Sequence, residues 1–311
     1  MTPSALDGFS TRAFRTRVLD WYDAQGRSLP FRGTDDPYRI LVSEAILQQT
    51  QIARGAPAWA VFIARFPTVE SLAAASPADV LRVWRGLGYN RRAINLQRAA
   101  RMVVDQLGCV FPRDLAGLER LPGVGPYTAR AVASIAFRQR VGAVDTNVRR
   151  VLGRAVGGEV GAFTKGELQT VADALVAPSR PDAWTHALMD LGSTICRPRA
   201  PRCPDCPVRS ICRYAGRAED GARAAPTDGS ATAGSVRVPR PRFKATSRWL
   251  RGRILDRLRD ADGEAWAEFA EPIGGHDLRA VAVALTALAA DGLVELGPGG
   301  GRPPRARLPI A

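Results

Sequence analysis

Lysine is almost absent from this chain of 311 residues. Its 44 basic residues include only two lysines, Lys165 and Lys244, so arginine supplies nearly all of the positive charge. With 30 acidic residues the formal net charge is +14 at pH 7. A charge of this size favours a polyanionic partner, most often a nucleic acid and less often a membrane surface. The alternative is a compositional bias towards arginine that serves no partner.

Long apolar runs are also missing. No stretch approaches the ~20 apolar residues that a membrane-spanning helix needs, and the N-terminal residues lack the apolar core of a secretory signal. We therefore expect a cytoplasmic protein that makes no membrane contact. In that reducing compartment, clustered cysteines suggest metal binding rather than disulfides.

Strand patterns are lacking as well, because no segment of the N-terminal two thirds alternates apolar and polar residues over a strand length. No internal repeat is evident. Apolar residues recur instead at helical spacing, which predicts an all-α body. The predicted helices are Thr11–Tyr22, Tyr38–Gln51, Ala58–Phe66, Val69–Ala75, Pro77–Gly86, Arg91–Leu107, Leu115–Arg120, Tyr127–Phe137, Val148–Arg154, Lys165–Val176 and Asp182–Asp190.

The composition changes sharply after Tyr214. Residues 215–242 are small, polar and rich in glycine and proline, which predicts a flexible linker. Residues 243–311 then predict a small winged-helix-like domain, whose function is either an extra DNA contact or packing and protein binding. Its predicted elements are a helix Ser247–Arg259, a short segment around Ala265–Phe269, a helix Asp277–Asp291 and a two-stranded wing from Gly292–Leu296 and Arg302–Leu308.

A glycine-bracketed turn from Leu121 to Gly125 separates two of the predicted helices. Gly123 and Gly125 can adopt positive φ, which lets another backbone approach closely. The first turn of the following helix offers backbone N–H groups and the positive end of the helix dipole, and together these bind phosphate. The pattern fits a grip on a nucleic-acid backbone, but an ordinary helix connection would look the same.

Two carboxylates have unusual surroundings. Glu44 shares a helix face with Ile40 and Leu41, where desolvation would raise its pKa and keep a general acid protonated near neutral pH. Asp145 follows an apolar run and precedes a helix, so it fits an N-cap that backbone N–H groups hold ionised. A fixed anion of this kind can also stabilise a developing cation. The ordinary alternatives are a solvated helix glutamate and a simple cap.

Four of the five cysteines lie close together. Their spacing, C-x6-C-x2-C-x5-C, suits zinc or an iron–sulfur cluster without choosing between them, and the site could be purely structural. Cys109 lies apart and is expected to be a buried core thiol. The clustered cysteines are Cys196, Cys203, Cys206 and Cys212.

Eight motifs together carry a family resemblance. In chain order they are Asp20–Tyr22, Leu29–Arg32, Ser43–Gln51, Phe66–Thr68, Gly86–Tyr89, Leu121–Gly125, Asp145–Val148 and the four cysteines. Through them, residues from about Thr11 to Tyr214 resemble the MutY-type adenine DNA glycosylases, of the helix-hairpin-helix superfamily that also contains endonuclease III. The resemblance implies a two-lobed, all-α helix-hairpin-helix glycosylase fold over residues 1–214, with an iron–sulfur cluster loop at 196–212.

The resemblance also implies a role for each matching residue. Glu44 would protonate the leaving adenine and Asp145 would stabilise the oxocarbenium-like sugar, a division also found in sugar hydrolysis. Gln48 and Tyr89 would wedge into the duplex from which the base is extruded. The remaining implied positions are Asn147 in the catalytic site, Gly123, Val124, Gly125 and Thr128 at the DNA, and the four cysteines around a [4Fe-4S] cluster.

Tyr127 occupies the position at which relatives that also cleave the DNA strand carry a lysine. Only an amine can form the Schiff base of that reaction, and no lysine precedes Lys165. Tyr127 is therefore assigned to the catalytic site of a monofunctional, hydrolytic glycosylase.

The expected function is base excision repair of adenine mispaired with 8-oxoguanine or guanine. We expect a monomeric, nucleoid-associated bacterial enzyme that binds double-stranded DNA with mismatched or oxidised base pairs. We expect the family's usual NUDIX-like C-terminal domain to be absent, because residues 243–311 are too short and wrongly patterned for it. The rival hypotheses are a thymine or uracil mismatch glycosylase on the same scaffold, which Gln48–Gln51 disfavours, and a non-catalytic iron–sulfur DNA-binding factor, which the presence of Glu44 and Asp145 disfavours.

Overall fold

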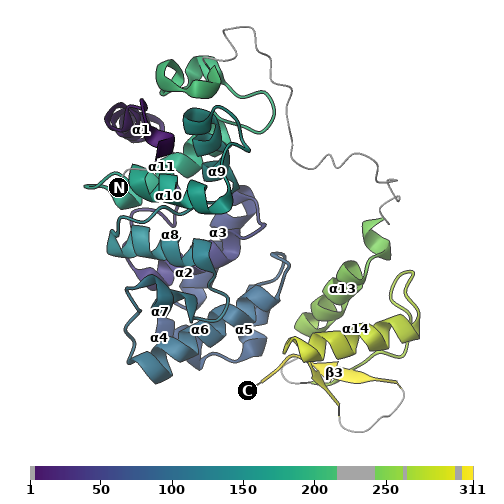
Figure 1. Ribbon diagram of the computed structural model, residues 1–311. Helices are drawn as coiled ribbons and strands as arrows, with labels where there is room; N and C mark the ends of the chain where they lie inside the picture. Colours follow the sequence, from purple (N-terminus) through teal and green to yellow (C-terminus); the bar gives the residue numbers. More distant parts are fainter. Residues whose placement is uncertain (1–3, 216–241, 262–264, 298–302, 311) are drawn as a thin grey trace. The chain divides into compact units, whose positions relative to one another are not determined.

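The computed structural model describes residues 4–215, 242–261, 265–297 and 303–310 (Figure 1). The predicted helical character is confirmed. The α-helices are α1 Thr11–Gln25, α2 Pro37–Leu47, α3 Ile52–Arg65, α4 Val69–Ala74, α5 Pro77–Val83, α6 Arg91–Leu107, α7 Leu115–Glu119, α8 Pro126–Phe137, α9 Thr146–Leu152, α10 Lys165–Leu175, α11 Pro181–Thr194, α13 Ser247–Asp260 and α14 Leu278–Ala290.

Helix ends follow the capping chemistry that the sequence offers. Thr68 and Thr164 accept hydrogen bonds from the backbone three residues further on and open α4 and α10 with complete capping boxes. Helix α6 spans the predicted residues and ends at Gly108, which takes the left-handed conformation with φ +59°. None of the described helices combines the length and apolar character that crossing a bilayer needs.

The largest difference from the prediction concerns the helix expected at Tyr38–Gln51. It ends at Leu47, because the chain turns there and Gln49 adopts a left-handed φ of +58°. Helix α3 then begins at Ile52, six residues before the predicted start at Ala58, and continues through Pro57. The sequence motif Gln48–Gln51 therefore forms a turn in which Gln49 and Gln51 are exposed, not the last turn of a helix.

Contacts group the described residues into two compact units. One comprises the described parts of Met1–Ile40, Pro112–Arg120 and Val124–Ser235, and the other those of Leu41–Phe111, Leu121–Gly123 and Val236–Ala311.

The core of the first unit lies where α1, α9, α10 and α11 pack together (Figure 1). Phe14 and Trp184 are both buried and meet edge to face, with ring centroids 5.7 Å apart. Helix α11 also packs on α8, where the hydroxyl of Ser134 donates to the carbonyl of Pro181 at 2.9 Å. Helix α11 is thus the shared support of α1, α8 and α9.

The second unit has its core among α3, α4, α5 and α6, around buried aromatic side chains such as Phe62 and Trp84. The C-terminal segment, residues 242–310, belongs to this unit. Its buried Arg259 donates through Nε to the carbonyl of Leu81 at 2.8 Å, and the amide of Ala78 donates to the carbonyl of Pro309 at 2.8 Å. Both bonds attach the segment to α5.

The C-terminal segment itself contains α13, α14 and a small sheet in the order β1-β3-β2. The short segment predicted around Ala265–Phe269 contains strand β1, which pairs antiparallel with β3 as Ala267 faces Ala306. The predicted wing is present as the antiparallel pair of β2 and β3. The predicted linker, apart from its first and last residues, lies outside the described residues. The strands are β1 Ala267–Glu268, β2 Glu295–Leu296 and β3 Arg305–Arg307.

Candidate active site

Asp145 is the N-cap of α9, as its position before a helix predicts. Its Oδ1 accepts a hydrogen bond from the amide of Val148 at 2.7 Å, and its Oδ2 accepts one from Nδ2 of Asn147 at 2.7 Å. Helix α9 begins at Thr146, two residues earlier than predicted. Both carboxylate oxygens are therefore held by donors at the N-terminus of the helix.

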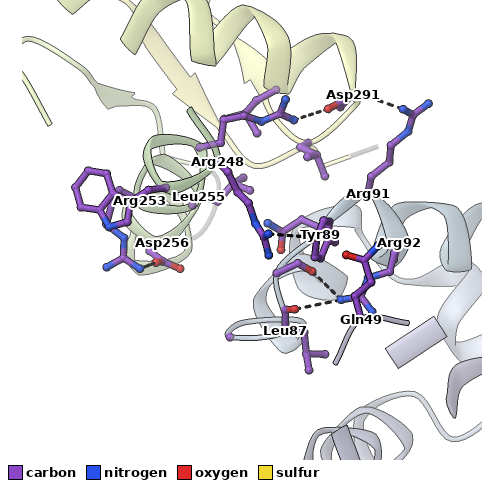
Figure 2. A pocket seen from close by; sticks show the side chains of 18 of the residues that line it. Gln49, Leu87, Tyr89, Arg91, Arg92, Arg248, Arg253, Leu255, Asp256 and Asp291 are labelled. Carbon is purple, nitrogen blue, oxygen red and sulfur yellow. Dashed lines mark hydrogen bonds and ion pairs between the residues drawn. The ribbon is translucent and has the colours of Figure 1, made fainter. Parts of the chain in front are cut away.

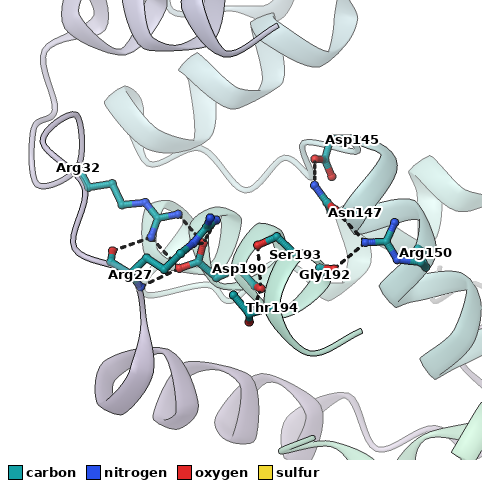
Figure 3. A network of polar contacts seen from close by, with 9 residues as sticks. All are labelled: Arg27, Arg32, Asp145, Asn147, Arg150, Asp190, Gly192, Ser193 and Thr194. Carbon is teal, nitrogen blue, oxygen red and sulfur yellow. Dashed lines mark hydrogen bonds and ion pairs between the residues drawn. The ribbon is translucent and has the colours of Figure 1, made fainter. Parts of the chain in front are cut away.

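Asn147 is oriented in turn by Arg150, one helical turn further along (Figure 3). The Nη2 of Arg150 donates to Oδ1 of Asn147 at 2.8 Å and to the carbonyl of Gly192 at 2.6 Å. An arginine can only donate, so the amide oxygen of Asn147 must face it and the amide nitrogen must face Asp145. The Nε of Arg150 also donates to the carbonyl of Cys196 at 2.6 Å. A chain of hydrogen bonds thus joins the cysteine loop to the Asp145 carboxylate.

Gly192 lets α11 approach the start of α9 closely. A Cβ added to it would lie 2.6 Å from the Cβ of Asn147, a distance that real Cβ atoms do not show, and 3.0 Å from its carbonyl oxygen, which is already a tight contact. The hydrogen bond from Arg150 to Gly192 depends on this approach. The position of Asp145 is therefore set by packing of α11 as well as by the local cap.

Asp190 is a heavily hydrogen-bonded carboxylate on α11 that was not among the residues predicted from the sequence. It is fully buried on α11 and accepts hydrogen bonds from the backbone amide and side chain of Arg27 and from both Nη atoms of Arg32, at 2.8 and 2.7 Å (Figure 3). Burial raises the pKa of Asp190, but the bonds from the two arginines outweigh it and hold the pKa below the usual 3.8. The network ties the loop after α1 to α11. A lone aspartate on an apolar helix face was the only signal in the sequence.

The four clustered cysteines line one cavity together with Arg154 and Tyr214. None of the four is in a disulfide. The Nη1 of Arg154 lies 3.5 Å from Sγ of Cys196 and donates to the carbonyl of Arg197 at 2.8 Å, so a buried cation supports the loop. Four unpaired thiols around one cavity fit a metal centre with four thiolate ligands. Within the described residues, no group of three or more ligand side chains is already arranged to hold a metal ion.

Cys109 does not match its prediction. Its side chain is exposed, and its backbone has a φ of +64° immediately after the end of α6. Because the helix ends at Gly108, the residue that follows points away from the core instead of into it.

The hairpin glycines differ from each other. Gly123 has φ +82°, and a Cβ there would lie 2.8 Å from the Cβ of Asn95, so both the backbone and the space require glycine. Gly125 is extended, with φ −98° and ψ 178°, and the described residues leave the space around its Cβ position open. Gly125 therefore does not use the positive φ that glycine allows. No contact within the described chain explains this glycine.

The other hairpin positions are mostly inside the protein. Val124 and Thr128 are only 8% and 4% exposed, so their side chains pack inside the protein, and their role at the DNA stays a prediction. Tyr127, on the first turn of α8, is half-buried. What the hairpin displays outwards is its backbone around Gly123 and Gly125, both of which are exposed.

Glu44 belongs to the second unit and is 9% exposed on α2, beside the buried Ile40 and Leu41, as its apolar stripe predicts. Gln48 and Tyr89, the predicted wedge residues, line one groove of this unit. Tyr89 is 42% exposed and has a left-handed φ of +45°. An exposed aromatic ring on a strained backbone is typical of a functional position.

A family model described as HhH-GPD superfamily base excision DNA repair protein matches residues 42–161. The chain is similar to an adenine DNA glycosylase of Mycolicibacterium smegmatis, with 41% identity over 280 residues that cover 89% of this chain and 91% of the relative. An adenine DNA glycosylase of Mycobacterium tuberculosis is 44% identical over 252 residues, 79% of each chain. Among solved structures, a thermostable thymine-DNA glycosylase matches with a TM-score of 0.63 and 30% identity, over 67% of this chain and 97% of that one.

Proposed function

This chain belongs to the adenine DNA glycosylases of the HhH-GPD superfamily, and we propose that it removes adenine mispaired with 8-oxoguanine or guanine in double-stranded DNA. The enzyme hydrolyses an N-glycosidic bond in base excision repair. The observation that carries the proposal is the Asp145 carboxylate, fixed by the start of α9 and by Asn147 in a family whose curated relatives excise adenine.

In the proposed reaction Glu44 is the acid and Asp145 is the electrostatic partner. Glu44 gives its proton to the adenine, and the electron pair of the bond between the sugar and the base leaves with adenine. The sugar becomes cationic, Asp145 stabilises it, and water adds to the anomeric carbon and loses a proton. The buried position of Glu44 suits an acid that must stay protonated near neutral pH.

Adenine release is tested with a single-turnover panel of duplexes that carry A, T, U or hypoxanthine opposite G and 8-oxoguanine. We expect adenine to be released from the duplexes with 8-oxoguanine and G. The strand should stay intact until alkali or heat is applied, because Tyr127 cannot form a Schiff base. Strand cleavage by the pure protein would contradict the monofunctional assignment.

Thymine excision is the second candidate, because one of the matching solved structures is a thymine-DNA glycosylase. The same panel separates the two candidates. Release of thymine opposite G without release of adenine would reverse their order.

The cysteine cavity supports a [4Fe-4S] cluster as the cofactor. Its ligands would be the thiolates of Cys196, Cys203, Cys206 and Cys212, which line the cavity without disulfides. When bound, the cluster would cross-link the loop after α11. Arg150 and Arg154 hold that loop through the carbonyls of Cys196 and Arg197.

The two hairpin glycines should respond differently to alanine. Gly123→Ala should destabilise the protein by about 1–2 kcal/mol, because of its left-handed φ, with a further cost from the contact with Asn95. Gly125→Ala should leave thermal unfolding unchanged or slightly improved, yet weaken duplex binding, because the added methyl group occupies the space where a DNA backbone would approach. Thermal unfolding and fluorescence anisotropy on one duplex measure both effects. If Gly125→Ala binds the duplex as tightly as the wild type, the hairpin does not contact DNA at this position.

Arg150 should affect the single-turnover rate of adenine release, because it orients Asn147. Arg150→Met leaves the carbonyls of Gly192 and Cys196 without this donor and Asn147 free to rotate. We expect a loss of about 10- to 100-fold in single-turnover rate at saturating enzyme, the size of effect that a misplaced catalytic group produces. Arg150→Lys should not restore it, because an ammonium lacks the planar fork. The matched control is Arg149→Met, an exposed arginine on the same helix, and an equal loss there would contradict the assignment.

A further inference from the structure

A cationic groove of about 830 Å³ lies in the second unit. Its walls are the turn after α2, the turn Gly86–Asn90 before α6, and the helix α13 of the C-terminal segment (Figure 2). Seven arginines and two aspartates line it, and no lysine or glutamate does. The arginines are Arg54, Arg91, Arg92, Arg248, Arg251, Arg253 and Arg259.

Arg248 reaches from α13 to Tyr89, the residue predicted to wedge into the duplex (Figure 2). The guanidinium carbon of Arg248 lies 4.1 Å from the centroid of the tyrosine ring, and its Nη1 donates to the phenol oxygen at 2.8 Å. An arginine has five N–H donors, so the tyrosine uses one and leaves the others for a ligand. The C-terminal segment thus fixes the ring while keeping a cation beside it.

The arginines of the groove differ in what they contact, and some support the backbone, some pair with aspartates and some are surface charges. Arg92, on the first turn of α6, supports the backbone. Its Nη1 donates to the carbonyls of Ala45 and Gln48 at 2.7 and 2.6 Å, so it links α6 to the end of α2 and the turn that follows it. Arg251 and Arg253 pair with Asp291 and Asp256.

Arg54 and Arg248 are the surface charges. Neither has a carboxylate partner among the described residues, so the groove carries positive charge that the described chain does not neutralise. A second exposed aromatic ring, that of Phe243 at 62% exposure, stands at the groove wall.

We propose that α13 completes the DNA-binding surface: the groove receives the sugar–phosphate backbone of the duplex beside the Tyr89 wedge, Arg54 and Arg248 contact phosphates, and Arg248 also positions the tyrosine ring. The proposal rests on the proposed function, which makes duplex DNA the substrate. Planar guanidinium groups match phosphate geometry, and exposed aromatic rings stack on unpaired bases. The combination of the two fits a nucleic acid better than an acidic protein, which would need no stacking platform.

The test measures binding of the full chain to a duplex of about 30 base pairs carrying A opposite 8-oxoguanine, by fluorescence anisotropy over a range of salt concentrations. Each phosphate contact contributes about 0.9 to the slope of log affinity against log salt. Arg54→Ala and Arg248→Ala should each reduce the magnitude of that slope by about 0.9, and the double variant by about 1.8. The control Arg279→Ala removes an exposed arginine of α14 that lies outside the groove and should leave the slope unchanged.

A double-mutant cycle tests the positioning role. If part of the effect of Arg248 comes from positioning the Tyr89 ring, the double variant should lose less affinity for DNA than the sum of the losses of Arg248→Ala and Tyr89→Ala. Thermal unfolding of Arg248→Ala should match the wild type, because the side chain is largely at the surface.

Three results would overturn the proposal. The first is an unchanged salt slope in both Arg54→Ala and Arg248→Ala, and the second is an equal change of slope in Arg279→Ala. The third is tighter binding or faster excision by Arg248→Ala, which would mean that α13 inhibits the enzyme by covering Tyr89. Failure of the proposed function gives a different pattern, in which the slopes change as expected but the wild type releases no adenine.

Discussion

Asp145→Asn should reduce single-turnover adenine release by about 10³-fold or more while the protein stays folded and binds DNA. The loss follows from removal of the fixed anion that is proposed to stabilise the developing cation, because preorganised electrostatic groups of this kind contribute most to catalysis. Asparagine is as good an N-cap as aspartate, so α9 should keep its first turn. The variant therefore separates catalysis from capping. Rates at saturating enzyme, duplex affinity and thermal unfolding are the three measurements.

The matched control for this prediction is Asp277→Asn. Asp277 caps α14 in the same way, accepting from the amide of Ala280 at 2.8 Å, and lies in the C-terminal segment. Its replacement should leave rate and stability unchanged. Retention of a tenth or more of the wild-type rate by Asp145→Asn would show that Asp145 is only a cap.

Asp190→Ala should lower the free energy of unfolding by roughly 3–5 kcal/mol, the range for removing one partner from a buried ion pair. The Arg27 and Arg32 guanidinium groups would lose their shared acceptor, and Arg32 has a side chain that is only 10% exposed. If the alanine variant does not fold, the milder variant Asp190→Asn can replace it, because asparagine keeps the volume and one acceptor oxygen. Chemical denaturation measures the change in the free energy of unfolding.

The control is Asp182→Asn. The pair of Asp182 with Arg138 is 4.0 Å long and open to water, so its loss should cost less than about 1 kcal/mol.

The contribution of Asp190 should depend on pH in a defined direction. Its pKa is lower in the folded protein than the usual 3.8, so the folded state holds the proton less tightly than the unfolded chain does. The stabilisation is therefore fully present above the unfolded pKa, near 4, and is lost as pH falls through the lower folded pKa. The stability difference between wild type and Asp190→Ala should be constant from about pH 5 to 7 and shrink below pH 4. A difference that grows on acidification would contradict the assigned network.

The sequence predicted local features well where the signal is itself local. Helix α6, the cap at Asp145 and the burial of Glu44 follow from apolar spacing and N-cap chemistry, which act within a few residues. Predictions failed where the backbone chose between allowed conformations. The turn at Gln49 and the exposure of Cys109 both depend on left-handed residues that helical periodicity does not reveal.

The sequence by itself determined the chemistry available to this protein: two carboxylates in the right motifs, tyrosine at the hairpin in place of lysine, four clustered cysteines, and a large excess of arginine. Tertiary structure alone decided which of the arginines are supports. The side chains of Arg150 and Arg92 bind backbone carbonyls, whereas Arg248 meets an aromatic ring 159 positions away in the sequence. The reason is physical. An arginine carries the same charge everywhere, and only the acceptors that folding brings to its side chain determine whether it holds the protein together or remains available for DNA.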